Sequence, residues 1–281
     1  MSVLASIGLI LLNRITWTID AMSMEFLAYI GRKVTNFLSE TGQIMRLFGS
    51  VLRYLPQIPK NSRLILNQMK VIGADSLPLV VLIGIFTGAI AAVEATDLFI
   101  KFNLLGLAKP FIGSSIATAV FTELTPVLTA LVIAVRIGGA MAAEIGTMKV
   151  TEQIDALEMM AIDKARYLVM PRLVAAIFMM PVLAVFSNLV ALAGGFALTL
   201  ISFDFSFGQF FDSVQRFFRI GELLTGIVKT MVFGGITTII GCHVGFSTAG
   251  GAEGVGQSTV RAYTLSAALI LIADAVIGAI I

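Results

Sequence analysis

The sequence predicts an all-α, polytopic membrane protein with about five transmembrane helices, and three observations support this fold class. Charged residues make up only 13% of the 281 residues and the mean hydropathy is +0.97, whereas soluble domains carry about 25% charged residues. Several apolar stretches reach the length of about 20 residues that a membrane-spanning helix needs. The 26 glycines fit helices packed closely in lipid, because small residues let backbones approach.

Composition also argues against other classes of protein. The net charge of +2 implies no nucleic-acid-binding face. The single cysteine, Cys242, excludes an intramolecular disulfide and a multi-cysteine metal site, and the single histidine, His243, leaves almost no material for a histidine-based metal centre. We therefore expect no catalytic residues, no metal and no cofactor, and we interpret these two side chains as helix-end packing.

The N-terminal quarter divides into two segments. Residues 1–24 form an extension whose uncharged stretch, Ser2–Asn13, is too short to span comfortably and lacks the basic region of a secretory signal. An interfacial anchor, a sixth span and an upstream-start artefact all remain open for it. In residues 25–75 apolar and charged residues alternate at helical spacing, which predicts amphipathic helices lying along the membrane surface, interrupted at Pro56 and Pro59.

Residues 76–281 form the predicted transmembrane domain. Its second apolar stretch is too long for a single span at 1.5 Å per residue, so we expect an extension or a kink, with Pro126 as the bending point. The five spans are predicted at Leu77–Leu98, within Phe111–Met148, within Leu173–Phe203, at about Leu223–Gly245 and at Ala262–Ile281.

Lysine and arginine predict the orientation of these spans. Seven lie between residue 25 and the first span (Arg32, Lys33, Arg46, Arg53, Lys60, Arg63 and Lys70), and four lie between the second and third spans. Only two lie in each of the opposite loops. By the positive-inside rule the N-terminal region is cytoplasmic and the C-terminus faces the other side.

A short polar helix is predicted at about residues 151–161, in the cytoplasmic loop after the second span. Thr151 is a suitable N-cap, and Glu152 and Asp155 lie where the helix dipole favours negative charge. Its apolar face is expected to contain Ile154, Leu157 and Met160 or Ala161. Such a helix suits a groove on a cytoplasmic partner, although an ordinary surface helix between two spans would look the same.

Three motifs identify a family. The central one reads RIGGAMAAEIGTMKVTEQIDALEMMAIDKARYLVMPR from Arg136 to Arg172, the second is STAGGAEGVG at Ser247–Gly256 followed by Thr259 and Arg261, and the third is Glu123-Leu124 with Pro126-Val127. Together they resemble the signature of the MlaE family of permeases, the membrane subunits of ABC transporters associated with Mce-domain proteins. The resemblance covers roughly residues 25–281.

The resemblance implies a function and partners. It implies a homodimeric permease of the bacterial inner membrane that moves phospholipids, or related hydrophobic lipids, between inner and outer membranes through a periplasmic Mce-domain protein. It also implies that the polar helix is a coupling helix that docks on a cytoplasmic ABC ATPase. The coupling residues would be Thr151, Glu152, Gln153, Asp155, Leu157 and Glu158.

The glycine-rich segment before the last span imitates a phosphate-binding loop. Gln257 stands where the lysine of such a loop is required, and no βαβ pattern surrounds it. We therefore expect ATP hydrolysis to come from a separate polypeptide, and we expect a cytoplasmic turn or hinge here, formed by Gly250, Gly251, Gly254 and Gly256.

Apart from Glu94 and Asp97 near the end of the first span, five charged residues fall inside predicted spans. A charge at bilayer depth costs about 2.5–3.5 kcal/mol on insertion scales, so it is normally paired or faces a cavity. Glu123 and Lys229 are expected to lie in the non-cytoplasmic half, where with Asp274 they either line a lipid-headgroup cavity or form a buried structural pair. Arg136 and Glu144 are expected toward the cytoplasmic half, as structural charges.

The chain departs from the family pattern beside Glu123. Many relatives have arginine before this glutamate and glycine after the following leucine, whereas Thr122 and Thr125 stand here. Headgroup contact through that arginine is therefore absent.

Two other functional classes compete with this interpretation. An ion-coupled secondary transporter would use Glu123, Lys229 and Asp274 as ion sites, but such folds often contain inverted repeats, and the sequence has no visible internal repeat. An integral-membrane enzyme of lipid metabolism would need clustered acidic or histidine residues, and the carboxylates here are scattered.

Overall fold

The computed structural model describes residues 29, 31–36, 38–102, 109–203, 206–217 and 219–280, which contain helices and no strand. The chain divides into two compact units, Met1–Arg46 and Leu47–Ile281. In the first unit residues 31–36 and 38–46 are helical and largely exposed. The predicted extension, residues 1–24, lies outside the described residues.

The amphipathic region continues into the second unit. Its helix runs to residue 54 and is followed by the 3-10 segment η1 (Leu55–Asn61), which holds Pro56 and Pro59, so the predicted break is confirmed. Next come α2 (Ser62–Ile72) and the 3-10 turn η2 (Ala74–Ser76). The helix α2 packs against α9 and buries two isoleucines, while its other face is exposed. This pattern agrees with the predicted amphipathic character.

Five helical runs in the described part of the chain are long and apolar enough to cross a membrane, which confirms the predicted number. The first run ends with α3 (Leu77–Lys101). After the 3-10 turn η3 (Lys109–Phe111), the second run joins α5 (Ile112–Ala119), η4 (Val120–Leu124), α6 (Thr125–Ile133), η5 (Ala134–Gly138) and α7 (Gly139–Val150). The third run joins η6 (Ala165–Val169) and α9 (Met170–Phe203), the fourth is α11 (Ile220–Phe246) and the fifth is α12 (Gly251–Ile280), while the shorter helices α8 (Gln153–Met159) and α10 (Phe207–Phe217) lie in the connections.

The second run is a continuous helix from Ile112 to Val150 that contains two π-helical segments. The first segment, η4, ends at Leu124, two residues before Pro126, where a bend was predicted. Proline lacks the N–H that the α-helical hydrogen-bond ladder requires, which explains an irregular helix at this point. The second, η5, was not predicted. Glu123 lies in η4 and Arg136 lies in η5, and π-helical segments inside helices are frequent at functional sites.

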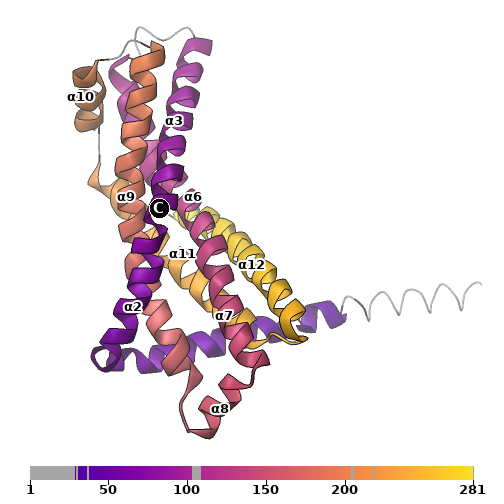
Figure 1. Ribbon diagram of the computed structural model, residues 1–281. Helices are drawn as coiled ribbons and strands as arrows, with labels where there is room; N and C mark the ends of the chain where they lie inside the picture. Colours follow the sequence, from indigo (N-terminus) through magenta and orange to yellow (C-terminus); the bar gives the residue numbers. More distant parts are fainter. Residues whose placement is uncertain are drawn as a thin grey trace, which may run out of the picture. The chain divides into compact units, whose positions relative to one another are not determined.

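Glycines bring the spans into close contact. Figure 1 shows α3 and α9 running side by side, and a Cβ added at Gly88 of α3 would collide with the Ala191 carbonyl of α9. A Cβ added at Gly241 of α11 would lie 2.8 Å from the Gly138 carbonyl oxygen. Such close backbone approach is typical of helix pairs in membranes.

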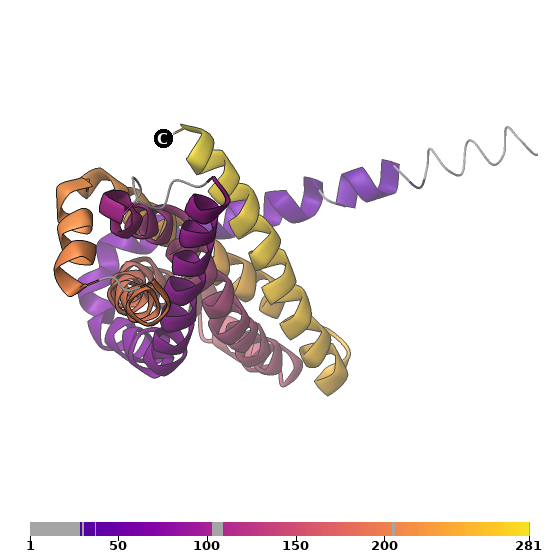
Figure 2. The ribbon, with the colours of Figure 1, turned by 90° about the horizontal axis from the view of Figure 1, so that it is seen from above.

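The helix α10 lies in a loop where no helix was predicted. A Cβ added at Gly113 of α5 would collide with the Phe210 carbonyl, and the Ser114 amide donates to the Ser213 hydroxyl at 3.1 Å. Figures 1 and 2 show α10 and α12 on opposite sides of the α3–α9 pair. The helix was missed because it is too short and too polar to register as a span.

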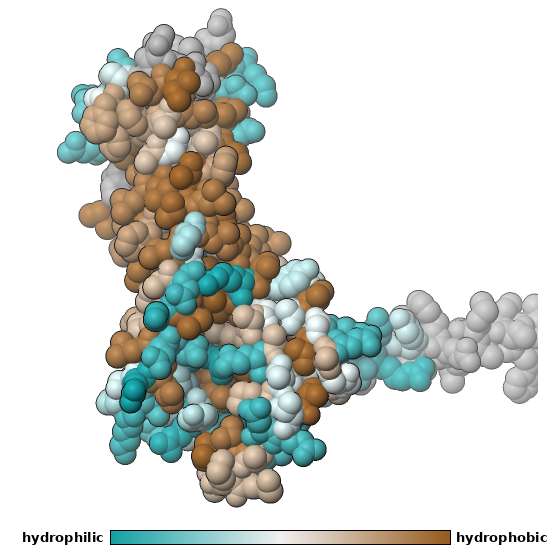
Figure 3. Space-filling model, viewed as in Figure 1, coloured by the Kyte–Doolittle hydropathy of each residue, from teal (hydrophilic) through white to brown (hydrophobic). Residues whose placement is uncertain are grey.

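The surface of the bundle is divided by polarity. Figure 3 shows an apolar band over the upper parts of α3 and α9 and polar side chains around α2. Exposed apolar side chains on these two helices include Leu82, Ile85, Phe86 and Ile90 on α3 and Phe186 and Leu189 on α9. Exposed apolar surface of this extent is expected where lipid is the solvent.

Candidate functional site

A lysine between two carboxylates forms the most unusual cluster in the bundle. The Lys229 ammonium of α11 lies 2.7 Å from Glu123 Oε1 in η4 and 2.8 Å from Asp274 Oδ1 on α12. Figure 1 shows the C-terminal end of α12 reaching the region of α6 and α11. The three side chains that the sequence analysis assigned to one cavity therefore meet, although they come from three different helical runs.

Burial differs strongly within this triad. The Lys229 side chain is 1% exposed, that of Asp274 is 18% exposed and that of Glu123 is 53% exposed. A buried ammonium is tolerated because two carboxylates surround it. The triad carries a net charge of −1, and its accessible negative charge is on Glu123.

Glu123 and Lys229 open into a pocket of about 390 Å³, within the roughly 300–1,000 Å³ range of small-molecule sites. The pocket is lined by Thr122, Glu123, Arg219, Gly221, Glu222, Thr225, Lys229 and Gly278. Glu222 Oε2 accepts a hydrogen bond of 2.9 Å from the Thr118 hydroxyl.

Sequence reasoning missed Arg219 and Glu222 as site residues. Both lie at the start of α11, just before the predicted span at about Leu223–Gly245. Their separation of three residues, next to a span that carries a buried lysine, is the signal that would have suggested a shared face.

Arg136 and Glu144 do not meet each other. Arg136 donates hydrogen bonds to the Ser76 hydroxyl and, at 3.4 Å, to the Val71 carbonyl. Glu144 pairs at 2.8 Å with Arg172, a buried arginine at the start of α9. Each charge thus ties the second helical run to a neighbouring element.

The polar helix predicted at about residues 151–161 is α8, Gln153–Met159, and the predicted N-cap is wrong. The Thr151 hydroxyl instead donates at 2.8 Å to the Thr147 carbonyl and so closes the end of α7. Glu152 occupies the cap position with a φ of 60°, and the chain turns there.

The acidic side chains of α8 are partly neutralised within the chain. Asp155 pairs with Lys149 and Glu158 pairs with Lys164, both at 2.8 Å. Ile154 is buried and Leu157 is half-buried, as expected for the inner face. Met160 lies outside that face, since it and its neighbour Met159 are exposed at the end of α8, Met159 to 84%.

The glycine turn is shorter than predicted. Only Gly250 and Gly251 have positive φ, at 89° and 70°, whereas Gly254 and Gly256 lie inside α12. A Cβ added at Gly254 would collide with the Ala249 carbonyl, so this position in the first turn of α12 requires glycine.

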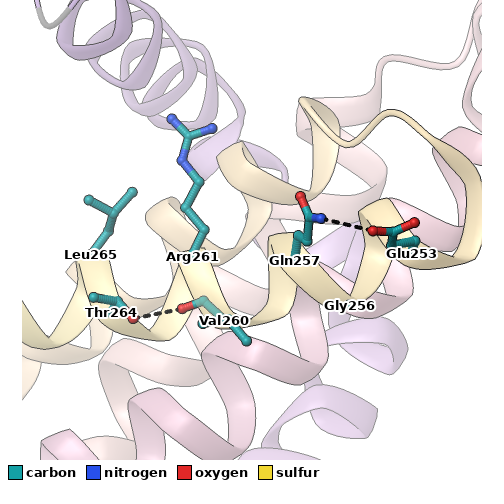
Figure 4. Close-up of a pocket in the computed structure, with 7 residues that line it drawn as sticks. All are labelled: Glu253, Gly256, Gln257, Val260, Arg261, Thr264 and Leu265. Atoms are coloured by element: carbon teal, nitrogen blue, oxygen red, sulfur yellow. Dashed lines mark hydrogen bonds between the residues drawn. The ribbon is translucent and has the colours of Figure 1, made fainter.

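A second, more apolar pocket of about 760 Å³ follows this turn along one helix. Figure 4 shows its lining residues, all from α12: Glu253, Gly256, Gln257, Val260, Arg261, Thr264 and Leu265. Gln257 donates to Glu253 at 3.4 Å, one turn away. The α12 span is also the least covered, with 11% of its most apolar window buried against 39–50% in the other four.

Metal chemistry has no obvious site among the described residues, which contain no group of three or more His, Cys, Asp or Glu side chains able to hold an ion. Cys242 and His243 are both buried in α11, shortly before it ends at Phe246.

Comparison with known proteins identifies the family. The model of the family described as "Permease MlaE" matches residues 65–280. A probable ABC transporter permease protein of Synechocystis is 39% identical over 228 residues, which are 81% of this chain and 85% of the relative. The intermembrane phospholipid transport system permease protein MlaE of Haemophilus influenzae is 33% identical over 264 residues, 92% of this chain and 98% of the relative.

A plant protein extends this set of relatives. The chloroplastic protein TRIGALACTOSYLDIACYLGLYCEROL 1 of Arabidopsis thaliana is 36% identical over 213 residues, 76% of this chain and 60% of the relative. With the family model matching most of the chain and full-length relatives above 30% identity, this protein belongs to the MlaE permease family.

Proposed function

We propose that this chain is the membrane-spanning subunit of an ATP-driven transporter that moves phospholipids between the inner and outer membranes. The name of the Haemophilus relative supports the substrate class, and the name of the Synechocystis relative supports the ABC type. The observation that carries the proposal is the buried Lys229, held between Glu123 and Asp274 and opening into a pocket inside an apolar helical bundle.

The triad is better explained by ligand binding than by stability. Replacing a buried ion pair with apolar residues of similar volume is often neutral or stabilising, so a bundle that needed only packing would do as well with leucine here. A polar headgroup entering the lipid phase needs ionic and hydrogen-bonding partners at that depth. In the proposed function Glu123 presents the accessible charge, and Lys229 and Asp274 hold it in position.

The proposed contact with the ATPase is α8. Because Asp155 and Glu158 are paired with lysines of the same chain, and exposed ion pairs contribute little, the exposed Met159 and Met160 become the main apolar contact. Unbranched methionines adapt to the groove of a partner. Glu152 and Gln153 are exposed beside them.

The proposed partner of α12 is a second copy of this chain. Its span is largely uncovered, and its exposed apolar side chains include Val260, Leu271, Ile272 and Val276. A two-fold contact along this helix would close the pocket of Figure 4. Each subunit of such a dimer would then present one α8 to one ATPase.

The lysine and arginine distribution supports a cytoplasmic α8 and a periplasmic α10 in the bacterial inner membrane. A periplasmic Mce-domain protein would then exchange lipid with the transporter on the α10 side.

Reconstitution of the chain with its ATPase in vesicles tests the proposal. Transfer of a labelled phospholipid should require ATP, and Glu123→Gln should abolish it while the ATPase still co-purifies. Glu94→Gln is the matched control, because Glu94 is exposed on α3 and does not line the pocket. Transfer driven by an ion gradient without ATP would overturn the proposal in favour of a secondary transporter.

A further inference from the structure

We propose that the Glu123 pocket selects zwitterionic aminophospholipids, with Arg219 binding the phosphate and Glu123 and Glu222 binding the amine. This inference rests on the proposed function, and it adds a headgroup class and two residues, Arg219 and Glu222, to the site.

The first step is to find which cation can meet a phosphate. Two cations line the pocket, Lys229 and Arg219. The Lys229 ammonium is buried and already contacts two carboxylates, so a phosphate would have to displace one of them. Arg219 is exposed and takes part in no ion pair within the described part of the chain. It is therefore the cation available to a ligand.

The second step is the local geometry of Arg219. Its backbone is extended, with φ of −113° and ψ of 125°, directly before α11. Its carbonyl accepts the Glu222 amide at 3.0 Å, which forms the first turn of that helix. A guanidinium offers planar, bidentate donors that match phosphate oxygens, and the start of a long helix adds a favourable potential for the anion.

The third step is the surplus of carboxylates. Glu123 and Glu222 line the pocket, and Asp274 lies behind Lys229, so three negative charges face two positive ones. Glu123 uses Oε1 for Lys229, and Glu222 uses Oε2 for the Thr118 hydroxyl. The second oxygen of each carboxylate can accept from an ammonium. A net charge of −1 favours a headgroup that brings a cation and disfavours one that brings only a phosphate.

This arrangement also bears on the departure from the family pattern. Thr122, which stands where many relatives have arginine, lines the same pocket as Arg219. Its own hydroxyl is bonded at 2.8 Å to the Thr118 carbonyl. A guanidinium thus reaches this pocket from α11, although residue 122 does not provide one.

The test is a competition in vesicles that hold the reconstituted transporter with its ATPase. Phosphatidylethanolamine and phosphatidylglycerol with identical acyl chains compete for transfer. One charge-assisted contact worth about 1.4 kcal/mol corresponds to a preference of about tenfold, so we expect roughly that preference for ethanolamine. Glu222→Gln should bring the ratio toward one. Arg219→Gln should reduce transfer of both lipids, with partial recovery in Arg219→Lys.

Arg216→Gln is the matched control, because Arg216 is an exposed arginine of α10 that lines a different pocket. Co-purification of the ATPase with each variant reports assembly. Equal transfer of the two lipids by the unaltered protein, or an Arg219→Gln variant indistinguishable from Arg216→Gln, would overturn the inference and leave the proposed function intact. Lipid transfer that does not require ATP, or transfer of neither lipid, would count against the proposed function itself.

Discussion

Substitution of Lys229 by methionine separates the structural part of the triad from its functional part. The change keeps much of the side-chain volume and removes the positive charge between Glu123 and Asp274. Asp274, which is 18% exposed, is left without its cation. Removing one partner of a buried pair typically lowers the free energy of unfolding by about 3–5 kcal/mol, and we expect Lys229→Met to fall in that range.

Glu123→Gln should behave differently. Its side chain is 53% exposed, and exposed pairs typically contribute about 0.2–1 kcal/mol. Lys229 also keeps Asp274 as a partner in this variant. We therefore expect Glu123→Gln to be at least about 2 kcal/mol more stable than Lys229→Met, although both should lose transport.

A triple variant, Lys229→Met with Glu123→Gln and Asp274→Asn, completes the comparison. With no charge left in the triad, its stability should return close to that of the unaltered protein, since neutral replacements of buried pairs are often tolerated. Thermal unfolding of the purified complex measures stability, and ATP-dependent transfer of labelled phospholipid measures function. Transport at the unaltered rate by the triple variant would refute the functional role of the triad. Equal stabilities for Lys229→Met and Glu123→Gln would refute the reasoning from burial.

Three further predictions concern packing, a buried arginine and the partner helix. Gly88→Ala should destabilise the protein by about 1–3 kcal/mol or more, because the new methyl group meets the Ala191 carbonyl, whereas Gly208→Ala, with open space around it, should unfold at the unaltered temperature. Arg172→Met should lower the unfolding temperature of the purified protein, since it removes the Glu144 partner and the donor to the Leu168 carbonyl. Met159→Asp should reduce recovery of the ATPase on the purified chain at least tenfold without changing thermal stability, and full recovery would exclude this contact.

The number and order of the spans followed from composition, because length and apolarity are properties of each segment alone. The proline-marked break at η1 and the irregularity before Pro126 were equally local, since each reflects the missing N–H of proline. The motifs predicted the family before any contact was known.

Which charges pair was decided by the tertiary structure. Glu144 meets Arg172 rather than Arg136, and Arg219 reaches the pocket of Glu123, because helix rotation and crossing determine which side chains face each other. A sequence records which residues are charged or small, whereas their partners lie on other helices and depend on how the whole bundle packs.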